Sequence, residues 1–341
     1  MRLYWHAPDV EERDWLRFLL EDAVHEEVSD PGLEALGDDG IHVVSTNLVP
    51  LRELDRRVPP RQAPGKRVLV HLSDEWFSGG YATYRHFDAV VRTHHTHLAV
   101  GPGILTIPLG YPNREGSIPV LRPASERTVA WSFVGEMKAS RHEMAEEMTA
   151  VGAGTLLDTA DPAKRLSKPA FDALLADSSF SPCPMGNVML ETWRLYESME
   201  LGAIPLVERR PTLDYFSNLL GDRHPVPTFG SWREAARWCR RLLAEPSAMN
   251  AVQERIGAWW AEHKMAVREE VSAHVIGASR ARDLRAFARS PSNRSVALYE
   301  PLRMIELVRH QSAASLARRL LDPRAILARV ARDSGRSAGD S

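Results

Sequence analysis

The sequence has little cysteine. Its 341 residues include only Cys183 and Cys239, and no cysteine and histidine spacing typical of a zinc site occurs. Two cysteines suit a reducing compartment. The composition therefore excludes a disulfide-rich secreted domain and a structural zinc module.

The sequence also lacks long hydrophobic runs. No stretch of about 18 consecutive apolar residues occurs, so no segment is expected to span a membrane. The first residues, MRLYWHAPDVEERDW, carry charges but lack the apolar stretch that a signal peptide requires. We therefore expect a cytoplasmic protein, with any membrane contact peripheral and at the inner face.

A large excess of either charge is absent as well. The chain has 43 Lys and Arg residues against 45 Asp and Glu residues, a formal net charge of −2. Such a balance gives no long-range attraction to a polyanion, so we expect no nucleic-acid partner. The tail after Ala278 is Arg-rich and helical in pattern. It could pack back across the protein or lie on an anionic membrane surface.

What the chain does have is length for two domains, since 341 residues allow two cores of about 150 residues each. Short apolar runs alternate with helical or loop segments in both halves. This pattern favours α/β domains with mainly parallel sheets. The expected strands are 1–6, 41–44, 67–72, 87–92 and 104–107, then 128–134, 154–157, a strand starting at Phe180, 203–207 and 226–229.

Helix signals fall between these runs. Asp9 is expected to cap a helix that includes Trp15, Phe18, Leu19 and Val24, and Ser231 to cap one that reaches Leu243. Further helices are expected over 140–151, 164–176 and 245–276, while the proline-rich region before residue 67 is expected to be a loop.

The proline- and glycine-rich segment Gly110–Pro123 is interpreted as the linker between the halves. The expected divisions are an N-terminal domain over 1–115, a C-terminal domain over 124–277, an Arg-rich helical tail over 278–330 and a disordered end over 331–341.

The stretch Phe180–Val207 concentrates the residues with chemical potential. It is expected to form a strand, a tight loop, a helix ended by Gly202 and a second strand. In open α/β sheets, a loop that joins the carboxyl end of a strand to a helix N-terminus is the usual place for an anionic ligand. The pair Gly186 and Asn187 could offer backbone N–H groups there. A plain βαβ packing unit is the alternative.

The expected helix of this stretch carries Glu191, Arg194 and Glu197 at three-residue spacing. A guanidinium gives phosphate oxygens a fixed, bidentate partner, and a carboxylate can accept hydrogen bonds from a diol. An ordinary surface ladder of ion pairs has the same spacing, so the charges alone do not choose between the two interpretations.

This stretch resembles the exostosin family of glycosyltransferases, whose pattern reads roughly F-x-x-C-P-x-G, then R-L-x-E-A, then G-x-I-P-V. The matching positions are Phe180, Cys183, Pro184, Gly186, Arg194, Leu195, Glu197, Gly202, Ile204 and Pro205. Ser198 replaces the usual Ala, and Met185 stands where a basic residue is common. The strand 131–135 followed by Arg141, and the segments 71–75 and 88–92, also resemble the family.

The resemblance implies an α/β protein of the GT-B fold, with two Rossmann-like domains that face a central cleft and with C-terminal helices. It implies transfer of a sugar from a nucleotide-sugar donor, UDP- or GDP-linked, to a hydroxyl acceptor on a glycan, a lipid-linked glycan or a natural product. Such enzymes need no cofactor and generally no metal at the diphosphate, and this sequence has no D-x-D motif at a strand end.

The resemblance also implies roles for single residues. Arg194 would bind the diphosphate and Glu197 the ribose hydroxyls, with Gly135, Lys138, Arg141, Pro184, Gly186 and Asn187 completing the donor site. We expect an inverting transfer, which also needs a general base for the acceptor hydroxyl. Asp74 and Glu75 follow a strand of the first half and are the candidates, whereas His71 within that strand is expected to be a core histidine.

Two other functions stay open. The chain could be a catalytically silent GT-B protein that binds a nucleotide sugar beside an active transferase, or it could be a nucleotide-sugar epimerase. The general base discriminates a transferase from a silent binder, and product analysis discriminates a transferase from an epimerase.

Overall fold

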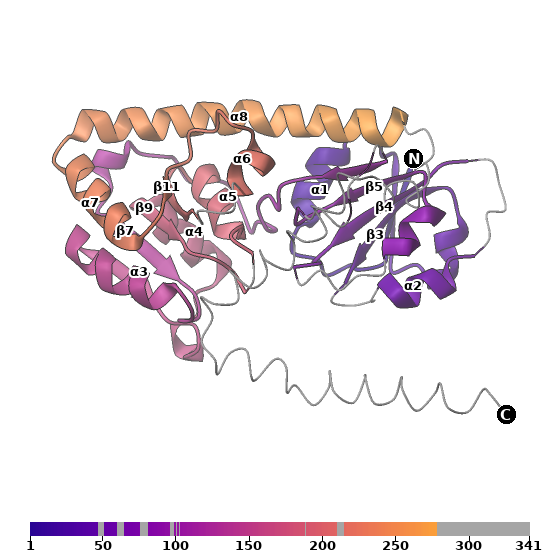
Figure 1. Cartoon of the computed structure of the whole chain (residues 1–341), viewed down its shortest axis with the longest axis horizontal. Coiled ribbons are helices and arrows are strands. Elements are labelled where there is room, and N and C mark those ends of the chain that lie inside the picture. The colour runs from indigo at the N-terminus through magenta and orange to yellow at the C-terminus, as the bar shows by residue number, and fades with distance from the viewer. Residues whose placement is uncertain are drawn as a thin grey trace, which may run out of the picture.

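The computed structural model describes residues 1–46, 51–59, 65–75, 81–95, 99, 101, 103–187, 189–209 and 215–277. Two parallel β-sheets with helices packed against them form two domains that lie side by side (Figure 1). The expectation of an α/β protein with two parallel sheets is therefore confirmed.

The N-terminal domain holds the first sheet, whose strand order is β2-β1-β3-β4-β5-β6 with every pairing parallel. Its strands are β1 (Arg2–Trp5), β2 (Glu26–Ser29), β3 (Gly40–Ser45), β4 (Arg67–Leu72), β5 (Ala89–Arg92) and β6 (Ile104–Thr106). Its helices are α1 (Arg13–Leu20), α2 (Leu51–Arg57) and the 3-10 helices η1 (Leu33–Gly37) and η2 (Tyr81–His86).

The C-terminal domain holds the second sheet, with order β11-β10-β9-β7-β8 and again only parallel pairings. Its strands are β7 (Val129–Val134), β8 (Gly154–Leu157), β9 (Ser178–Cys183), β10 (Ile204–Glu208) and β11 (Thr228–Phe229). Its helices are α3 (Arg141–Met148), α4 (Lys168–Ala176), α5 (Trp193–Glu200), α6 (Tyr215–Leu220), α7 (Trp232–Leu243) and the 3-10 helices η3 (Ala124–Glu126), η4 (Thr149–Val151) and η5 (Pro162–Lys164).

The central strands of both sheets are covered on both faces. β3, β4, β9 and β10 are buried along their whole length, which is the usual state of a strand inside a parallel sheet with both faces covered. In each sheet the order of strands reverses once, beside β1 in the first and beside β7 in the second. A ligand is expected at the carboxyl ends of the strands at such a point.

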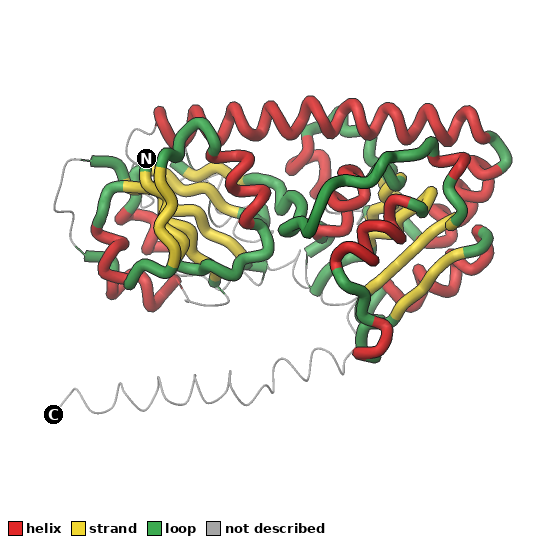
Figure 2. The backbone as a smooth tube through the Cα atoms, turned by 180° about the vertical axis from the view of Figure 1, so that it is seen from behind, coloured by secondary structure: helices red, strands yellow, loops and turns green. Residues whose placement is uncertain are grey.

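The long helix α8 (Pro246–Gly277) joins the two domains (Figure 1). It starts beside α7 in the C-terminal domain and runs across to the N-terminal domain, where it packs against α1. Seen from behind, it spans the same two halves (Figure 2). Trp260 near its middle stacks on Trp15 of α1 with ring centroids 5.9 Å apart and lies 5.4 Å from Tyr196 of α5. One helix therefore shares a core with each domain.

The helix capped by Ser231 is confirmed, because the Ser231 hydroxyl accepts a hydrogen bond from Glu234 N at 3.3 Å. The cap predicted at Asp9 is wrong. Helix α1 begins at Arg13 with Glu12 as the preceding residue, and it ends before Val24. The segment Asp9–Glu12 instead continues the turn that leads from β1 into the helix.

Besides the two 3-10 helices, one strand and one α-helix of the N-terminal domain were not predicted. The strand β2 is short and polar, with three Glu and Ser residues exposed at the sheet edge, so it lacks an apolar pattern. The helix α2 lies in the proline-rich region that was interpreted as a loop. Each element is too short for periodicity to reveal it.

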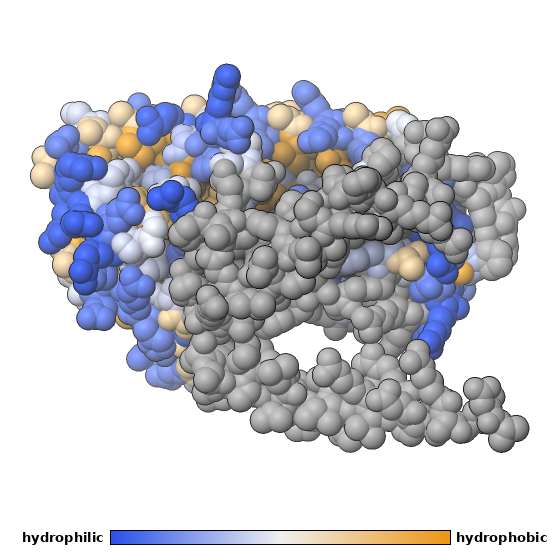
Figure 3. All heavy atoms as spheres, in the orientation of Figure 1, coloured by the Kyte–Doolittle hydropathy of each residue, from blue (hydrophilic) through white to orange (hydrophobic). Residues whose placement is uncertain are grey.

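The Arg-rich tail, which was expected either to pack back across the protein or to lie on a membrane surface, and the predicted disordered end lie outside the described residues. In the part of the chain that the structure describes, no helix combines the length and the apolar character needed to cross a membrane. The space-filling view shows a largely hydrophilic face on the C-terminal domain, with hydrophobic atoms mainly near the upper rim (Figure 3).

Candidate functional site

A cavity of about 450 Å³ lies between the two domains. The residues that line it follow the carboxyl ends of strands in both sheets, or belong to the segment that links the sheets. They are Glu12, Ser73, Glu75, His94 and Leu109 from the first half, and Lys138, Arg141, Gly186, Asn187, Glu191, Thr192, Trp193, Arg194 and Glu197 from the second. The cavity therefore lies where open α/β sheets bind ligands.

Most of the predicted site residues meet at this cavity. Glu75, Lys138, Arg141, Gly186, Asn187, Arg194 and Glu197 line it, whereas Asp74, Gly135 and Pro184 do not. The structure thus brings residues that are far apart in the sequence to one place, as the resemblance implied for Glu75 and the donor residues.

Arg141, the first residue of α3, is held by backbone carbonyl groups. Its Nη1 donates to Glu136 O at 2.8 Å, and its Nε and Nη2 donate to Met185 O at 3.3 and 3.1 Å. The side chain lies over the Phe133 ring, with Cζ 5.6 Å from the centroid. Burial, followed by the nearby charge of Arg194, lowers the pKa of Arg141 to about 10. The guanidinium stays charged at neutral pH but is poorly solvated.

Arg194 lies on the same aromatic ring. Its Cζ is 4.4 Å from the centroid of Phe133, and its Nη2 donates to Val134 O. Burial lowers its pKa, and its Nε has no hydrogen-bond partner among the described residues. Within the described part of the chain, neither Arg194 nor Arg141 forms an ion pair with a carboxylate. Two buried cations therefore lie beside the cavity without a paired anion.

Gly135 leaves room for the Arg194 guanidinium and the Phe133 ring. A Cβ atom at this position would lie 3.2 Å from Arg194 Nη2 and 3.0 Å from Phe133 Cζ. The residue is the first after β7, and its N donates to Leu157 O of β8 at 3.0 Å. Its lack of a side chain therefore lets Arg194 approach the end of the strand.

The loop after β9 contacts the N-terminal domain. Asn187 N donates to Glu75 Oε1 at 2.8 Å, and Asn187 Nδ2 donates to Glu75 Oε2 at 2.9 Å. Lys138 Nζ donates to Asn187 Oδ1 at 2.6 Å. Gly186 N donates to Met189 O at 2.8 Å. The expectation that these two backbone N–H groups point to a ligand is therefore not met in this arrangement, because both donate within the protein.

Glu197 lies on α5 one turn after Arg194. It is largely buried, and its Oε1 is 3.2 Å from Lys168 Nζ of α4. Burial raises its pKa, while Lys168 and Arg194 oppose that rise. Pro184 is buried beside the cavity without lining it.

Asp74 does not face the cleft, which corrects the prediction for this residue. Its Oδ2 is 3.0 Å from Arg92 Nη2, and both side chains are fully buried. The Tyr81 hydroxyl donates to the same oxygen at 2.7 Å. Asp74 therefore compensates a buried arginine, and of the two predicted bases only Glu75 reaches the cavity. His71 is confirmed as a core histidine, bonded to Thr46 and Tyr84.

Glu191 is not a member of a helical ion-pair ladder. It precedes α5, and it accepts hydrogen bonds from Leu109 N at 2.7 Å, from the Tyr215 hydroxyl at 2.8 Å and from the Tyr196 hydroxyl. Burial raises its pKa. Because Leu109 belongs to the segment that leaves the first sheet, Glu191 fastens that segment to the C-terminal domain.

Sequence reasoning missed Glu12, which also lines the cavity. Its side chain is 2% exposed, and burial raises its pKa to about 7. Ser73 and His94 were missed as cavity residues too. They have positive φ angles of 61° and 60°, a conformation that non-glycine residues rarely adopt and that often occurs at functional sites. No local pattern signals any of the three.

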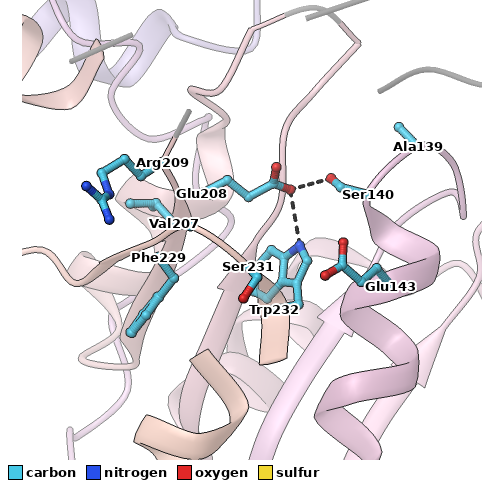
Figure 4. Close-up of a pocket in the computed structure, with 10 residues that line it drawn as sticks. Ala139, Ser140, Glu143, Val207, Glu208, Arg209, Phe229, Ser231 and Trp232 are labelled. Atoms are coloured by element: carbon cyan, nitrogen blue, oxygen red, sulfur yellow. Dashed lines mark hydrogen bonds between the residues drawn. The ribbon is translucent and has the colours of Figure 1, made fainter. Parts of the chain in front are cut away.

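A second cavity, of about 440 Å³, lies in the C-terminal domain alone, beside β10 and β11 (Figure 4). Glu208 points into it, and Arg209 points the opposite way. Glu208 Oε1 accepts hydrogen bonds from Ser140 Oγ, from Met185 N at 3.2 Å and from Trp232 Nε1 at 3.3 Å. Glu208 thus ties the loop after β7 to the loop after β9, the two loops that hold Arg141.

Among the described residues, no group of three or more His, Cys, Asp and Glu side chains is arranged to hold a metal ion. Comparison with models of protein families finds no match for this chain, and no curated protein matches it either.

Proposed function

We propose that this chain is a glycosyltransferase of GT-B architecture that moves a sugar from a nucleotide-sugar donor to a hydroxyl acceptor. The reaction would take place in the cavity between the domains. The proposal is supported by the position of that cavity, at the carboxyl ends of both parallel sheets, and by the chemistry of the residues that line it.

The observation that carries the proposal is the pair Arg141 and Arg194. Both guanidinium groups are buried beside Phe133, and Arg194 contributes to the lowered pKa of Arg141. Neither has a carboxylate partner in the described part of the chain. A diphosphate would supply the missing negative charge and accept charge-assisted hydrogen bonds from both planar groups.

The positive charge of the two arginines would stabilise the leaving group of glycosyl transfer. When the bond between the sugar and the diphosphate breaks, negative charge grows on the leaving nucleoside diphosphate, and fixed cations stabilise it. The two arginines and Lys138 provide that charge from the protein itself, so we propose a reaction that needs no metal at the diphosphate. Glu197, beside Arg194 on α5, is the proposed partner of the ribose hydroxyls.

The test is a thermal-shift panel of UDP- and GDP-linked sugars with the full chain. A donor present at 100 times its Kd should stabilise the protein by about 2.7 kcal/mol. Replacement Arg194→Lys removes the planar, bidentate group, and we expect at least a tenfold loss of donor affinity, about 1.4 kcal/mol. If no nucleotide sugar shifts the unfolding temperature, the proposal fails.

Arg127 offers a matched control for Arg194→Lys. It is a buried arginine of the same domain, bound to the carbonyl oxygens of Ser178, Leu201 and Arg122, and burial lowers its pKa to about 10. It precedes β7 and therefore lies at the opposite end of the sheet from the cavity. Arg127→Lys should lower the unfolding temperature without reducing the affinity for the donor.

Product analysis then separates the three functions that bind a nucleotide sugar. Transfer gives free nucleoside diphosphate and a glycosylated acceptor, which mass spectrometry detects. An epimerase would change the sugar while keeping the nucleotide attached, and a silent binding protein would return the donor unchanged.

A further inference from the structure

Glu12 lies at the carboxyl edge of the first sheet, in the turn between β1 and α1. β1 is the strand beside which the order of the sheet reverses, so this turn opens onto the point where a ligand is expected. The Glu12 side chain lines the interdomain cavity, across the domain interface from Arg141 and Arg194. The donor and the acceptor would thus react in the space between Glu12 and the two arginines.

The surroundings of Glu12 disfavour its charge. Its side chain is 2% exposed, and in the described part of the chain it forms no ion pair with a cation. The Trp193 side chain, from the other domain, is its hydrogen-bond partner, and the neighbouring acid Glu11 repels a second negative charge. Burial is the largest effect and, with a smaller contribution from Glu11, raises the pKa of Glu12 to about 7, while hydrogen bonds from its own backbone and from Trp193 oppose the rise. A carboxyl group of this kind can take up and release a proton near neutral pH.

Other charged groups line the same cavity. The acidic ones are Glu75, Glu191 and Glu197, the basic ones are Lys138, Arg141 and Arg194, and His94 is titratable. The three acidic groups already have partners. Glu75 accepts hydrogen bonds from Asn187, and Glu191 accepts them from Leu109 and two tyrosines. Glu197 pairs with Lys168. Among the cavity carboxylates of the described residues, Glu12 alone lacks both an ion pair and a backbone N–H from another element.

We propose that Glu12 is the general base that deprotonates the acceptor hydroxyl; this rests on the proposed transferase function. The Glu12 carboxylate takes the proton, and the acceptor oxygen forms a bond to the anomeric carbon of the sugar. The bond from that carbon to the diphosphate oxygen breaks, and its electron pair leaves with the nucleoside diphosphate. The proton on Glu12 then passes to solvent.

The experiment uses water as the acceptor, so that no natural acceptor is needed. Release of nucleoside diphosphate from UDP-glucose or GDP-mannose, whichever stabilises the full-length protein, is measured against pH. In the wild-type protein, we expect the rate to rise tenfold per pH unit below about 7 and to level off above it, because the base must be unprotonated. In Glu12→Gln, the rate should fall about 100-fold or more and this rise should disappear, while the thermal shift caused by the donor is kept.

Sodium azide provides the second measurement. Azide is a nucleophile that carries no proton to be removed, so it bypasses the base and gives a glycosyl azide. We expect azide to restore donor consumption in Glu12→Gln and to fail in Arg194→Lys, where donor affinity is lost. Glu12→Asp, which keeps a carboxylate, should keep the pH-dependent rise at a lower rate. If Glu12→Gln fails to fold, Glu12→Asp still tests whether the carboxylate sets the dependence of the rate on pH.

Glu11→Gln is the matched control, because Glu11 is the exposed neighbouring acid and does not line the cavity. It should keep a rate close to that of the wild type. If Glu12→Gln binds the donor and keeps both the rate and the pH-dependent rise, the role of Glu12 is overturned while the transferase proposal stands. If no UDP- or GDP-linked sugar of the panel binds the wild-type protein, both are overturned.

Discussion

Glu75 of the N-terminal domain and Asn187 of the C-terminal domain form a two-point contact. The backbone N and the side-chain Nδ2 of Asn187 donate to the two carboxylate oxygens of Glu75 at 2.8 and 2.9 Å. The contact crosses the mouth of the proposed donor site, since both residues line the same cavity. It fixes the loop after β9 against the opposite domain.

Glu75→Gln should weaken this contact, because a glutamine presents only one acceptor oxygen and its NH₂ group would face a donor. We expect a loss of about 1 to 3 kcal/mol in the free energy of unfolding, measured by urea denaturation. Donor hydrolysis should fall less than in Glu12→Gln. An equal or larger loss of hydrolysis, with stability unchanged, would instead make Glu75 the base.

Asp74→Asn should be strongly destabilising. It leaves Arg92, whose side chain is fully buried, without its paired carboxylate, and breaking such a pair costs about 3 to 5 kcal/mol. Asp55→Asn is the control, because Asp55 pairs with Arg85 on the surface and such pairs contribute about 0 to 1 kcal/mol. Equal effects of the two substitutions in urea denaturation would contradict the structural role of Asp74.

Gly135→Ala should reduce donor affinity, because the added Cβ would press on Arg194 Nη2 and the Phe133 ring at 3.2 and 3.0 Å. We expect the affinity for the donor, measured by thermal-shift titration, to fall about tenfold, which corresponds to about 1.4 kcal/mol. Gly257→Ala is a useful contrast. Gly257 lies exposed in α8 with open space around it, so alanine should stabilise the helix by up to about 1 kcal/mol and leave donor affinity unchanged. Unchanged affinity in Gly135→Ala would contradict the tight packing.

The raised pKa of Glu12 makes stability depend on pH in a defined direction. The folded protein binds the Glu12 proton up to about pH 7, whereas the unfolded chain releases it near 4.5. Stability is therefore lost as the pH rises from about 4.5 to 7. Glu12→Gln should be more stable than the wild type at pH 8 by about 3 kcal/mol, and the difference should vanish near pH 4. Urea denaturation at the two pH values measures this, and Glu11→Gln should show no comparable change.

The sequence predicts the sheets well because their central strands are buried on both faces. Such strands appear as short, largely apolar runs, as in 67–72 and 204–207, which can be recognised without tertiary context. The edge strand β2 has no such run, and it was missed. The helix α5 was predicted to include Glu191, but the hydrogen bonds from Leu109, Tyr196 and Tyr215 hold Glu191 ahead of the helix.

The candidate site was predictable only where a local motif carries it. Arg141 and Arg194 follow strand ends, and they lie beside the cavity. Whether Asp74 or Glu75 faces the cavity depends on how the chain turns after β4. Ser73, which precedes both residues, makes this turn with a positive φ angle. Glu12 forms a hydrogen bond with Trp193, 181 residues later in the chain, so no local pattern could reveal its buried position.

The helix α8 has a mechanical consequence for any opening of the cavity. Its 32 residues form a rod about 48 Å long. It is anchored in the C-terminal domain by the contact of Trp260 with Tyr196, and in the N-terminal domain by the stacking of Trp260 on Trp15 and by the hydrogen bonds of Arg268 to Asp22 and Glu21. A helix bound to both domains in this way resists their separation along its length. Opening of the cavity would therefore require the Glu75–Asn187 contact to break while α8 stays bound to both domains.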